Sequence, residues 1–178
     1  MKSIISILII SAVLVSCQKS MKDEGPNPAT EAFKRNSETV KKDIKNWQNE
    51  TPDYSIFADG FYFYPTQFST ELDSVSLADA IEEDKQTLAM LDFELIGDLV
   101  LLPGVNADTK EVDGSVRYYG QWKVTKSATD STEARSGVLD MYASYDFNDE
   151  GKVTNQVMYG DFSGLMGYLN KANDADGE

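Results

Sequence analysis

FNDEGKVTNQVMYGDFSGLMGYL, residues Phe147–Leu169, contains a turn, a strand and the start of a helix in one run. Asn148–Gly151 is a hairpin signal, because Asn, Asp and Gly tolerate the left-handed backbone that a tight reversal needs. In the segment Lys152–Tyr159 the alternate positions from Val153 to Tyr159 are mostly apolar and the others mostly polar. This alternation predicts a half-buried antiparallel strand.

A helix is predicted to follow this strand. Phe162, Leu165, Met166 and Leu169 recur at the spacing of one helix face. Asp161 stands just before them, where its carboxylate can accept a hydrogen bond from an unpaired backbone N–H of the first helical turn. The run therefore predicts a hairpin, a strand and a capped helix, against which the rest of the chain packs.

Two short motifs in this run resemble the SnoaL-like branch of the nuclear-transport-factor-2-like superfamily. They are GKV at Gly151–Val153 and DFSGL at Asp161–Leu165. The resemblance covers residues 29–169 and implies one α+β domain: a cone-shaped, curved antiparallel sheet packed on N-terminal helices, with a pocket at its wide end. It leaves the function open, because the superfamily includes isomerases, cyclases, dehydratases and non-catalytic binding domains.

Two helices are predicted before the main strands. The first begins near residues 29–31, with Thr30 as a candidate cap, and runs to about Asn49, before Pro52. Its apolar stripe comprises Phe33, Val40, Ile44 and Trp47. The second covers about residues 77–91, and its apolar face comprises Leu77, Ala80, Ile81, Leu88 and Leu91.

The acidic run 82–84 in the second helix suggests calcium ligands. However, three consecutive helical positions point in different directions, whereas calcium ligands come from loops with alternating oxygens. A solvated helix face is the preferred interpretation.

Three further strands are predicted, over residues 93–102, 115–126 and 137–147, and the first is expected to stop at Pro103-Gly104. In the second, one face comprises Val116, Tyr118, Gly120, Trp122 and Val124. In the third, one face comprises Leu139, Met141, Ala143, Tyr145 and Phe147.

The first 17 residues have the pattern of a lipoprotein signal peptide. Lys2 precedes an apolar run, residues 4–15, that is shorter than the roughly 20 apolar residues needed to cross a bilayer. Leu14–Cys17 resembles a bacterial lipobox, in which the cysteine becomes the lipidated first residue. Cys17 is the only cysteine, which excludes an internal disulfide, and an incidental buried cysteine is the alternative. We therefore expect an exported protein held in the cell envelope, at the outer membrane, by a lipid at Cys17.

A polar, proline-containing tether at residues 18–28 and a polar, acidic tail at 171–178 flank the domain, which is placed at residues 29–170. Gln18-Lys19 followed by acidic residues is similar to the surface-export signal of Bacteroidetes lipoproteins, although residues 20–22 intervene. Periplasmic and surface display both stay open.

The composition limits the partners. The chain has 16 Lys and Arg against 30 Asp and Glu, and loss of residues 1–17 would remove Lys2 and lower the formal net charge from −14 to −15. Such a charge repels nucleic acid, so no nucleic-acid partner is expected. The chain has no histidine, phosphate loop or metal-ligand spacing, so we predict no cofactor and no metal. A small molecule or a protein is the expected partner, and a homodimer stays open.

Aromatic residues crowd into residues 54–68, around an expected turn at Asp59-Gly60. Such clusters usually form the core, but tyrosine hydroxyls can also reach into a pocket. The residues predicted to line the ligand pocket are Tyr62, Tyr64, Tyr118, Trp122 and Tyr159.

Asp161 is the first candidate for catalysis. In the resembled family an acid near this point of the last strand can face the cavity as a base, and the alternative for Asp161 is the helix cap. Asp98 and Asp140 stand within predicted strands, where aspartate is depleted, and either can simply face solvent. The related ketosteroid isomerases combine a carboxylate base with a tyrosine and a protonated aspartic acid. No motif here allows that triad to be carried over.

Two functions follow. The first is non-catalytic binding of a small apolar ligand or a protein by an envelope lipoprotein with a SnoaL-like domain. The second is a small isomerase, cyclase or hydratase, with Asp161 as the general base and Tyr118 or Trp122 shaping the pocket. The two hypotheses differ in whether Asp161 must line an enclosed cavity.

Overall fold

The computed structural model describes residues 27–67, 74–129 and 132–171. The predicted signal peptide, Cys17, all but the end of the tether, and nearly all of the tail lie outside these residues. Among the described helices, none has the length and apolar character needed to cross a membrane.

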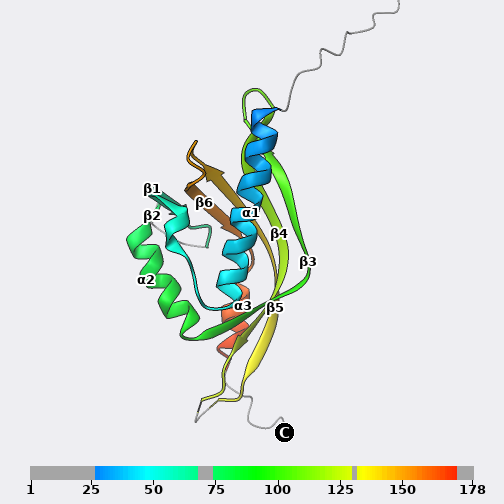
Figure 1. Cartoon of the computed structure of the whole chain (residues 1–178). Helices are drawn as coiled ribbons and strands as arrows, with labels where there is room; N and C mark the ends of the chain where they lie inside the picture. Colours follow the sequence, from blue (N-terminus) through cyan, green and yellow to red (C-terminus); the bar gives the residue numbers. More distant parts are fainter. Residues whose placement is uncertain (1–26, 68–73, 130–131, 172–178) are drawn as a thin grey trace, which may run out of the picture.

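One six-stranded, curved sheet forms the body of the molecule, in the order β2-β1-β6-β5-β4-β3 (Figure 1). All neighbouring strands pair antiparallel except β1 and β6, which are parallel. The strands are β1 (Phe57–Tyr64), β2 (Val75–Ser76), β3 (Leu91–Val105), β4 (Val112–Lys126), β5 (Arg135–Phe147) and β6 (Val153–Tyr159).

Helices cover the inner face of this sheet, and the short 3-10 helix η1 (Tyr54–Ile56) leads into β1. Helix α1 (Pro28–Gln48) packs on β3 and β4, and α2 (Leu77–Leu88) lies against β1. Helix α3 (Phe162–Leu169) packs on β5. The described elements therefore confirm the predicted α+β fold with its curved, mainly antiparallel sheet.

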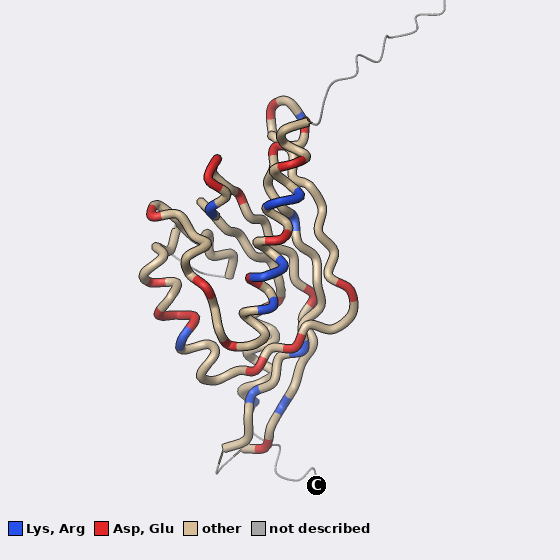
Figure 2. Tube along the Cα trace, viewed as in Figure 1, with Lys and Arg blue, Asp and Glu red and all other residues tan. Residues whose placement is uncertain are grey.

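Figure 2 marks several basic residues along α1, and some of them pair with nearby acids at the surface. Lys34 contacts Glu31 at 2.8 Å, and Lys42 contacts Asp53 at 2.8 Å. Such exposed pairs contribute little to stability. The fold depends instead on apolar burial.

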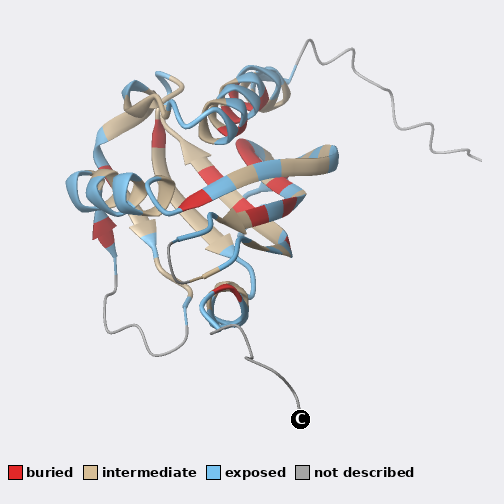
Figure 3. Ribbon diagram, turned by 90° about the horizontal axis from the view of Figure 1, so that it is seen from below, coloured by how far each residue is buried: buried red, intermediate tan, exposed pale blue. Residues whose placement is uncertain are grey.

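Buried residues gather where α1 faces the sheet (Figure 3). Val40 and Ile44 of α1 belong to one cluster with Val116 and Val124 of β4. The face of β4 that the alternation groups together is the inner one, because Val116 and Val124 are both fully buried.

The hairpin predicted at Asn148–Gly151 is present. The backbone N–H of Asn148 donates to the Lys152 carbonyl at 2.9 Å, and the Asn148 side chain accepts from the N–H groups of Glu150 and Lys152. Gly151 has φ of 76°, in the left-handed region that favours glycine. Asn and Gly therefore serve this turn as the sequence predicts.

The start of α1 differs from the prediction. Asn27, not Thr30, caps the helix, and its side chain accepts from the Ala29 N–H at 2.9 Å. Pro28, which was expected to end the tether, takes the first helical position. Proline is suited to that position because its missing N–H would be unpaired there in any residue.

Two predicted breaks in the strands, at Asp59-Gly60 and at Pro103-Gly104, are wrong. Asp59-Gly60 is not a turn but lies inside β1, where the register against β6 shifts between Phe57 and Tyr62. Pro103-Gly104 does not end β3, which continues to Val105 with a register shift at this place. Strand β3 is at the edge of the sheet, where a proline without an N–H breaks no ladder on its free side.

Beyond Thr154, the faces of β6 are the reverse of those expected. Phe147 pairs with Val153, but Asp146 pairs with Asn155, so Thr154 is an extra residue in β6. One extra residue moves every later side chain to the opposite face. Gln156 and Met158 therefore point inward, although the alternation suggested the opposite.

Candidate functional site

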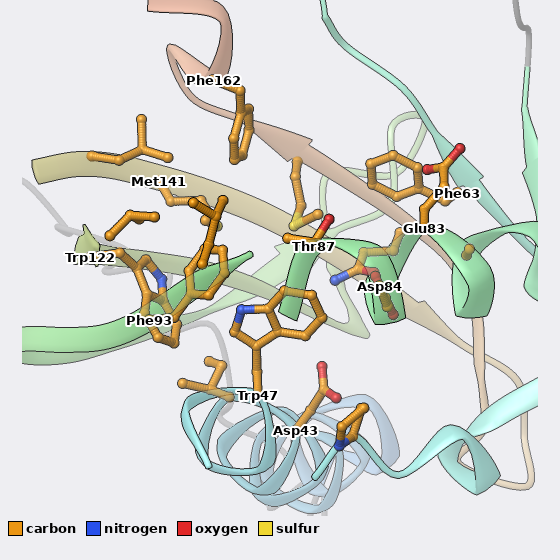
Figure 4. A pocket seen from close by; sticks show the side chains of 18 of the residues that line it. Asp43, Trp47, Phe63, Glu83, Asp84, Thr87, Phe93, Trp122, Met141 and Phe162 are labelled. Atoms are coloured by element: carbon orange, nitrogen blue, oxygen red, sulfur yellow. The ribbon is translucent and has the colours of Figure 1, made fainter. Parts of the chain in front are cut away.

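A cavity of about 370 Å³ lies between the helices and the inner face of the sheet. This volume is in the range of small-molecule sites, about 300–1,000 Å³. Helices α1, α2 and α3 and strands β1, β3, β4, β5 and β6 contribute to its wall. Aromatic rings supply much of the wall, among them Trp47, Phe63, Phe93, Trp122 and Phe162 (Figure 4).

Three neighbouring residues of β4 form one side of this cavity. The indole N–H of Trp122 donates to the hydroxyl of Tyr118, four residues earlier on the same face of the strand. Gly120 lies between them, and any Cβ there would overlap with the Tyr118 ring and hydroxyl. Burial raises the pKa of Tyr118 to about 12, so its hydroxyl stays protonated. The glycine thus allows a tyrosine and a tryptophan to pair along one strand.

An aspartic acid and a tyrosine meet where α1 faces β5. The hydroxyl of Tyr145, which is buried, donates to the carboxylate of Asp43 at 3.3 Å. Burial raises the pKa of Asp43 to about 7; the nearby charges of Asp84 and Asp53 act in the same direction, and the hydrogen bond from Tyr145 opposes them. This carboxyl can therefore take up and release a proton near neutral pH.

A second carboxyl faces the cavity from α2. Burial raises the pKa of Asp84 to about 6, and the charge of Glu83 adds to this effect. Tyr54 faces Asp84, and its buried hydroxyl has no well-formed hydrogen bond within the described residues. The cavity thus has two titratable carboxyls, each beside a tyrosine, on walls that are otherwise mostly apolar.

The predicted pocket residues divide between the two faces of the sheet. Tyr118 and Trp122 line the cavity. Tyr62, Tyr64 and Tyr159 are not among its lining residues, and their expected place in the pocket is corrected here. Tyr62 and Tyr64 alternate with the cavity-lining Phe61 and Phe63 of β1 and therefore lie on the outer face. Tyr159 follows the extra residue in β6 and is 55% exposed on that face.

Asp161 caps α3. Its side chain accepts a hydrogen bond from the Gly164 N–H at 2.9 Å, and it is not among the residues that line the cavity. Asp98 and Asp140 are exposed, and Asp140 accepts from the side chain of Gln121 at 2.8 Å. The structure therefore places none of the three predicted acids against the cavity.

The sequence did carry a signal for the two acids that do line it. Asp43 lies on the apolar stripe of α1, three residues after Val40 and four before Trp47. Asp84 continues the row of Leu77 and Ala80 at helical spacing, so the interpretation of residues 82–84 as a wholly solvated face is wrong for Asp84. An acid on an apolar stripe is costly to bury without a partner or a proton.

No group of His, Cys, Asp and Glu within the described residues has an arrangement that could hold a metal ion. The described groups that face the cavity are carboxyls, tyrosine hydroxyls, a few other polar side chains and apolar walls. Such groups can bind an apolar molecule with a polar end, and a carboxyl with a pKa near 7 can also transfer protons.

Comparison with solved structures gives many similar folds, although no protein-family model and no curated protein matches the sequence. A phenazine biosynthesis-related protein from Pseudomonas aeruginosa is 12% identical, with a TM-score of 0.57 over 89% of this chain and 96% of its own. A candidate SnoaL-like polyketide cyclase from Shewanella denitrificans is 13% identical, with a TM-score of 0.53 over 75% of this chain and 96% of its own. An NTF2-like protein from Burkholderia xenovorans is 13% identical, with a TM-score of 0.55 over 77% of this chain and 97% of its own. At these identities the likeness concerns the fold, and it shows that this chain has the nuclear-transport-factor-2-like fold that SnoaL-like proteins share.

Proposed function

We propose that the protein binds a small, mainly apolar molecule in its cavity, as an exported lipoprotein anchored through Cys17. The observation that carries the binding proposal is the cavity itself, with about 370 Å³ of space, aromatic walls and few polar groups. Sites of this kind bind ligands through apolar burial and use their polar groups for orientation. The lipobox-like sequence at Leu14–Cys17 supports the anchor.

Tryptophan fluorescence offers a direct test, because the chain has two tryptophans and both Trp47 and Trp122 line the cavity. Phenylbutanol, a neutral apolar probe, is titrated into the chain that carries Cys17→Ala to prevent lipidation. A saturable change in tryptophan emission is expected.

A matched pair of variants on α2 tests whether the probe binds in the cavity. Ala80 lines the cavity, whereas Ala78 is exposed on the same helix. Ala80→Phe is expected to abolish the saturable change by filling the space, and Ala78→Phe to leave it intact. If phenylbutanol and a wider panel of apolar probes leave the emission unchanged, or if both variants bind alike, the proposal is wrong.

A second candidate function is acid–base catalysis on an apolar substrate, as in an isomerase, cyclase or hydratase. The observation that favours it is Asp43, whose pKa of about 7 and contact with Tyr145 suit a general base beside a hydroxyl donor. Asp43 replaces Asp161 in this role, because Asp161 lies outside the cavity. The description of one solved structure of the same fold as a candidate polyketide cyclase supports this reading.

Catalysis of this kind can be detected without knowing the substrate. A general base in the cavity is expected to speed the exchange of α-hydrogens of an apolar ketone, such as phenylbutanone, with solvent deuterium, as followed by NMR. Asp43→Asn should abolish the exchange and Asp161→Asn should not. Binding without any faster exchange would leave only the non-catalytic function.

A further inference from the structure

The lining of the cavity has charge of one sign only. Its charged residues are Asp43, Glu83 and Asp84, and no Lys or Arg occurs among the described residues that line it. In Figure 4 the side chain of Asp43 extends from α1 and that of Asp84 from α2, on the same side of the cavity as Trp47. The two carboxyls are close enough for the charge of Asp84 to raise the pKa of Asp43.

Neither carboxyl has a cationic partner in the described structure. The lysine next to Asp43, Lys42, pairs with Asp53 at the surface, at 2.8 Å. Lys85, next to Asp84, contacts Glu82 at 3.6 Å and is 64% exposed. A charged group inside a protein is costly without an opposite charge or hydrogen bonds. The site therefore has acids at its polar end and no cation of its own.

We propose that the natural ligand is an amphipathic amine, with an apolar body between the aromatic walls and a protonated amine held by Asp43 and Asp84. This inference rests on the proposed binding function and adds the charge of the ligand to it. The hydroxyl of Tyr54, which faces Asp84 without a well-formed hydrogen bond, can accept a hydrogen bond from the same amine. Trp47 also lines the cavity, and an indole ring near a cation attracts it.

The raised pKa values of Asp43 and Asp84 are consistent with an amine as the ligand. The groups that face Asp43 are Asp84, Asp53 and Tyr145, and none of them is a cation. An amine between the carboxyls would lower both pKa values from about 7 and about 6, because an opposite charge favours the ionised form. Binding near pH 7 is therefore expected to release protons, whereas a neutral ligand would release none.

Three probes with the same apolar body test the inference: phenylbutylamine, phenylbutanol and phenylbutyrate, titrated into the Cys17→Ala chain. Tryptophan fluorescence gives the affinities, and calorimetry in two buffers of different ionisation enthalpy gives the number of protons released. The amine is expected to bind at least about tenfold more tightly than the alcohol, and the carboxylate most weakly.

Variants that remove one negative charge each test which residues cause the preference for the amine. Asp43→Asn and Asp84→Asn should each reduce the ratio of amine affinity to alcohol affinity by about fivefold. Glu82→Gln removes the same charge from the exposed side of α2 and should leave this ratio unchanged. A variant that does not fold is recognised by its lost alcohol binding, and the other variant then decides.

The outcomes separate the inference from the function on which it rests. If the alcohol binds as tightly as the amine, or if amine binding releases no protons, the inference is wrong and the binding function stands. If none of the three probes binds, both are wrong. Preference for the amine that persists unchanged in Asp43→Asn and Asp84→Asn would also overturn the inference, because the charge would then be recognised elsewhere.

Discussion

The hydroxyl of Tyr145 donates to the carboxylate of Asp43 at 3.3 Å and thereby joins strand β5 to helix α1 at the wall of the cavity. Asp43 titrates near neutral pH, because burial raises the pKa of its carboxyl from 3.8 to about 7. The contact that helps to hold the fold together therefore also depends on the proton of a cavity residue. Ligand binding and stability are expected to respond to the same range of pH.

Asp43→Asn should reduce the pH dependence of stability. Between pH 3.8 and about 7 the folded state retains a proton on Asp43 that the unfolded state has lost. The free energy of unfolding must then fall as pH rises through this window. A shift of about three pKa units corresponds to about 4 kcal/mol, and we expect the variant to lose a change on the order of this value. Urea denaturation at a series of pH values measures it.

Asp84, with a pKa of about 6, acts in the same direction, so some slope will remain in the Asp43→Asn variant. Asp53, with a pKa lowered to about 2 mainly by its hydrogen bond from Lys42, acts only below this window. Identical slopes for wild type and Asp43→Asn would contradict the prediction.

Gly120→Ala should disturb one wall of the cavity. Its Cβ would overlap with the Tyr118 side chain, which must then rotate and lose its hydrogen bond from Trp122. A destabilisation on the order of 2 kcal/mol is expected, with changed tryptophan emission. Thermal unfolding followed by fluorescence measures both.

Gly167→Ala is the matched control for this change. A Cβ at Gly167 in α3 would meet no atom within 4 Å, and alanine has the higher helix propensity. It should be neutral or slightly stabilising. Equal effects of the two glycine substitutions would show that crowding at Tyr118 is not the cause.

Asp161 offers a test that separates a helix cap from a catalytic base. Asp161→Ala should lower stability by about 1 kcal/mol, because the Gly164 N–H loses its partner, while Asp161→Asn should change it little. Neither should affect binding of phenylbutanol. If Asp161→Asn kept its stability but lost α-hydrogen exchange, the base would be Asp161 after all.

Cys17 determines the membrane behaviour in our proposal. When the full chain is expressed in a bacterium that processes lipoproteins, the wild type should enter the detergent phase on phase separation. Cys17→Ala should remain in the aqueous phase, because it lacks the N-terminal lipid that would carry the protein into the detergent. Identical partitioning of the two into the aqueous phase would remove the lipoprotein proposal.

Much of the fold could be predicted from local patterns. The hairpin at Asn148–Gly151 and the capped helix after Asp161 depend on turn and capping chemistry that the nearby residues determine. The two faces of β4 also followed from alternation, since its Val116 and Trp122 are both buried as expected. Such features need no knowledge of distant segments.

The site could not be predicted in the same way. The extra residue Thr154 reverses the later part of β6, and a single bulge of this kind has no clear local signal. Asp43 and Asp84 belong to helices far apart in the sequence, so only the assembled fold shows that both face one cavity. An acid on an apolar stripe was the sole hint, and it pointed to single residues rather than to a pair.

The place of β6 has a consequence for the order of assembly. This strand comes last in the sequence, yet it lies between β1 and β5 and pairs with both. Until Val153–Tyr159 has emerged from the ribosome, the early and late halves of the sheet each present an open edge and cannot be joined. A sheet that receives this inner strand after the other five stays incomplete until then, which would suit the export that we propose.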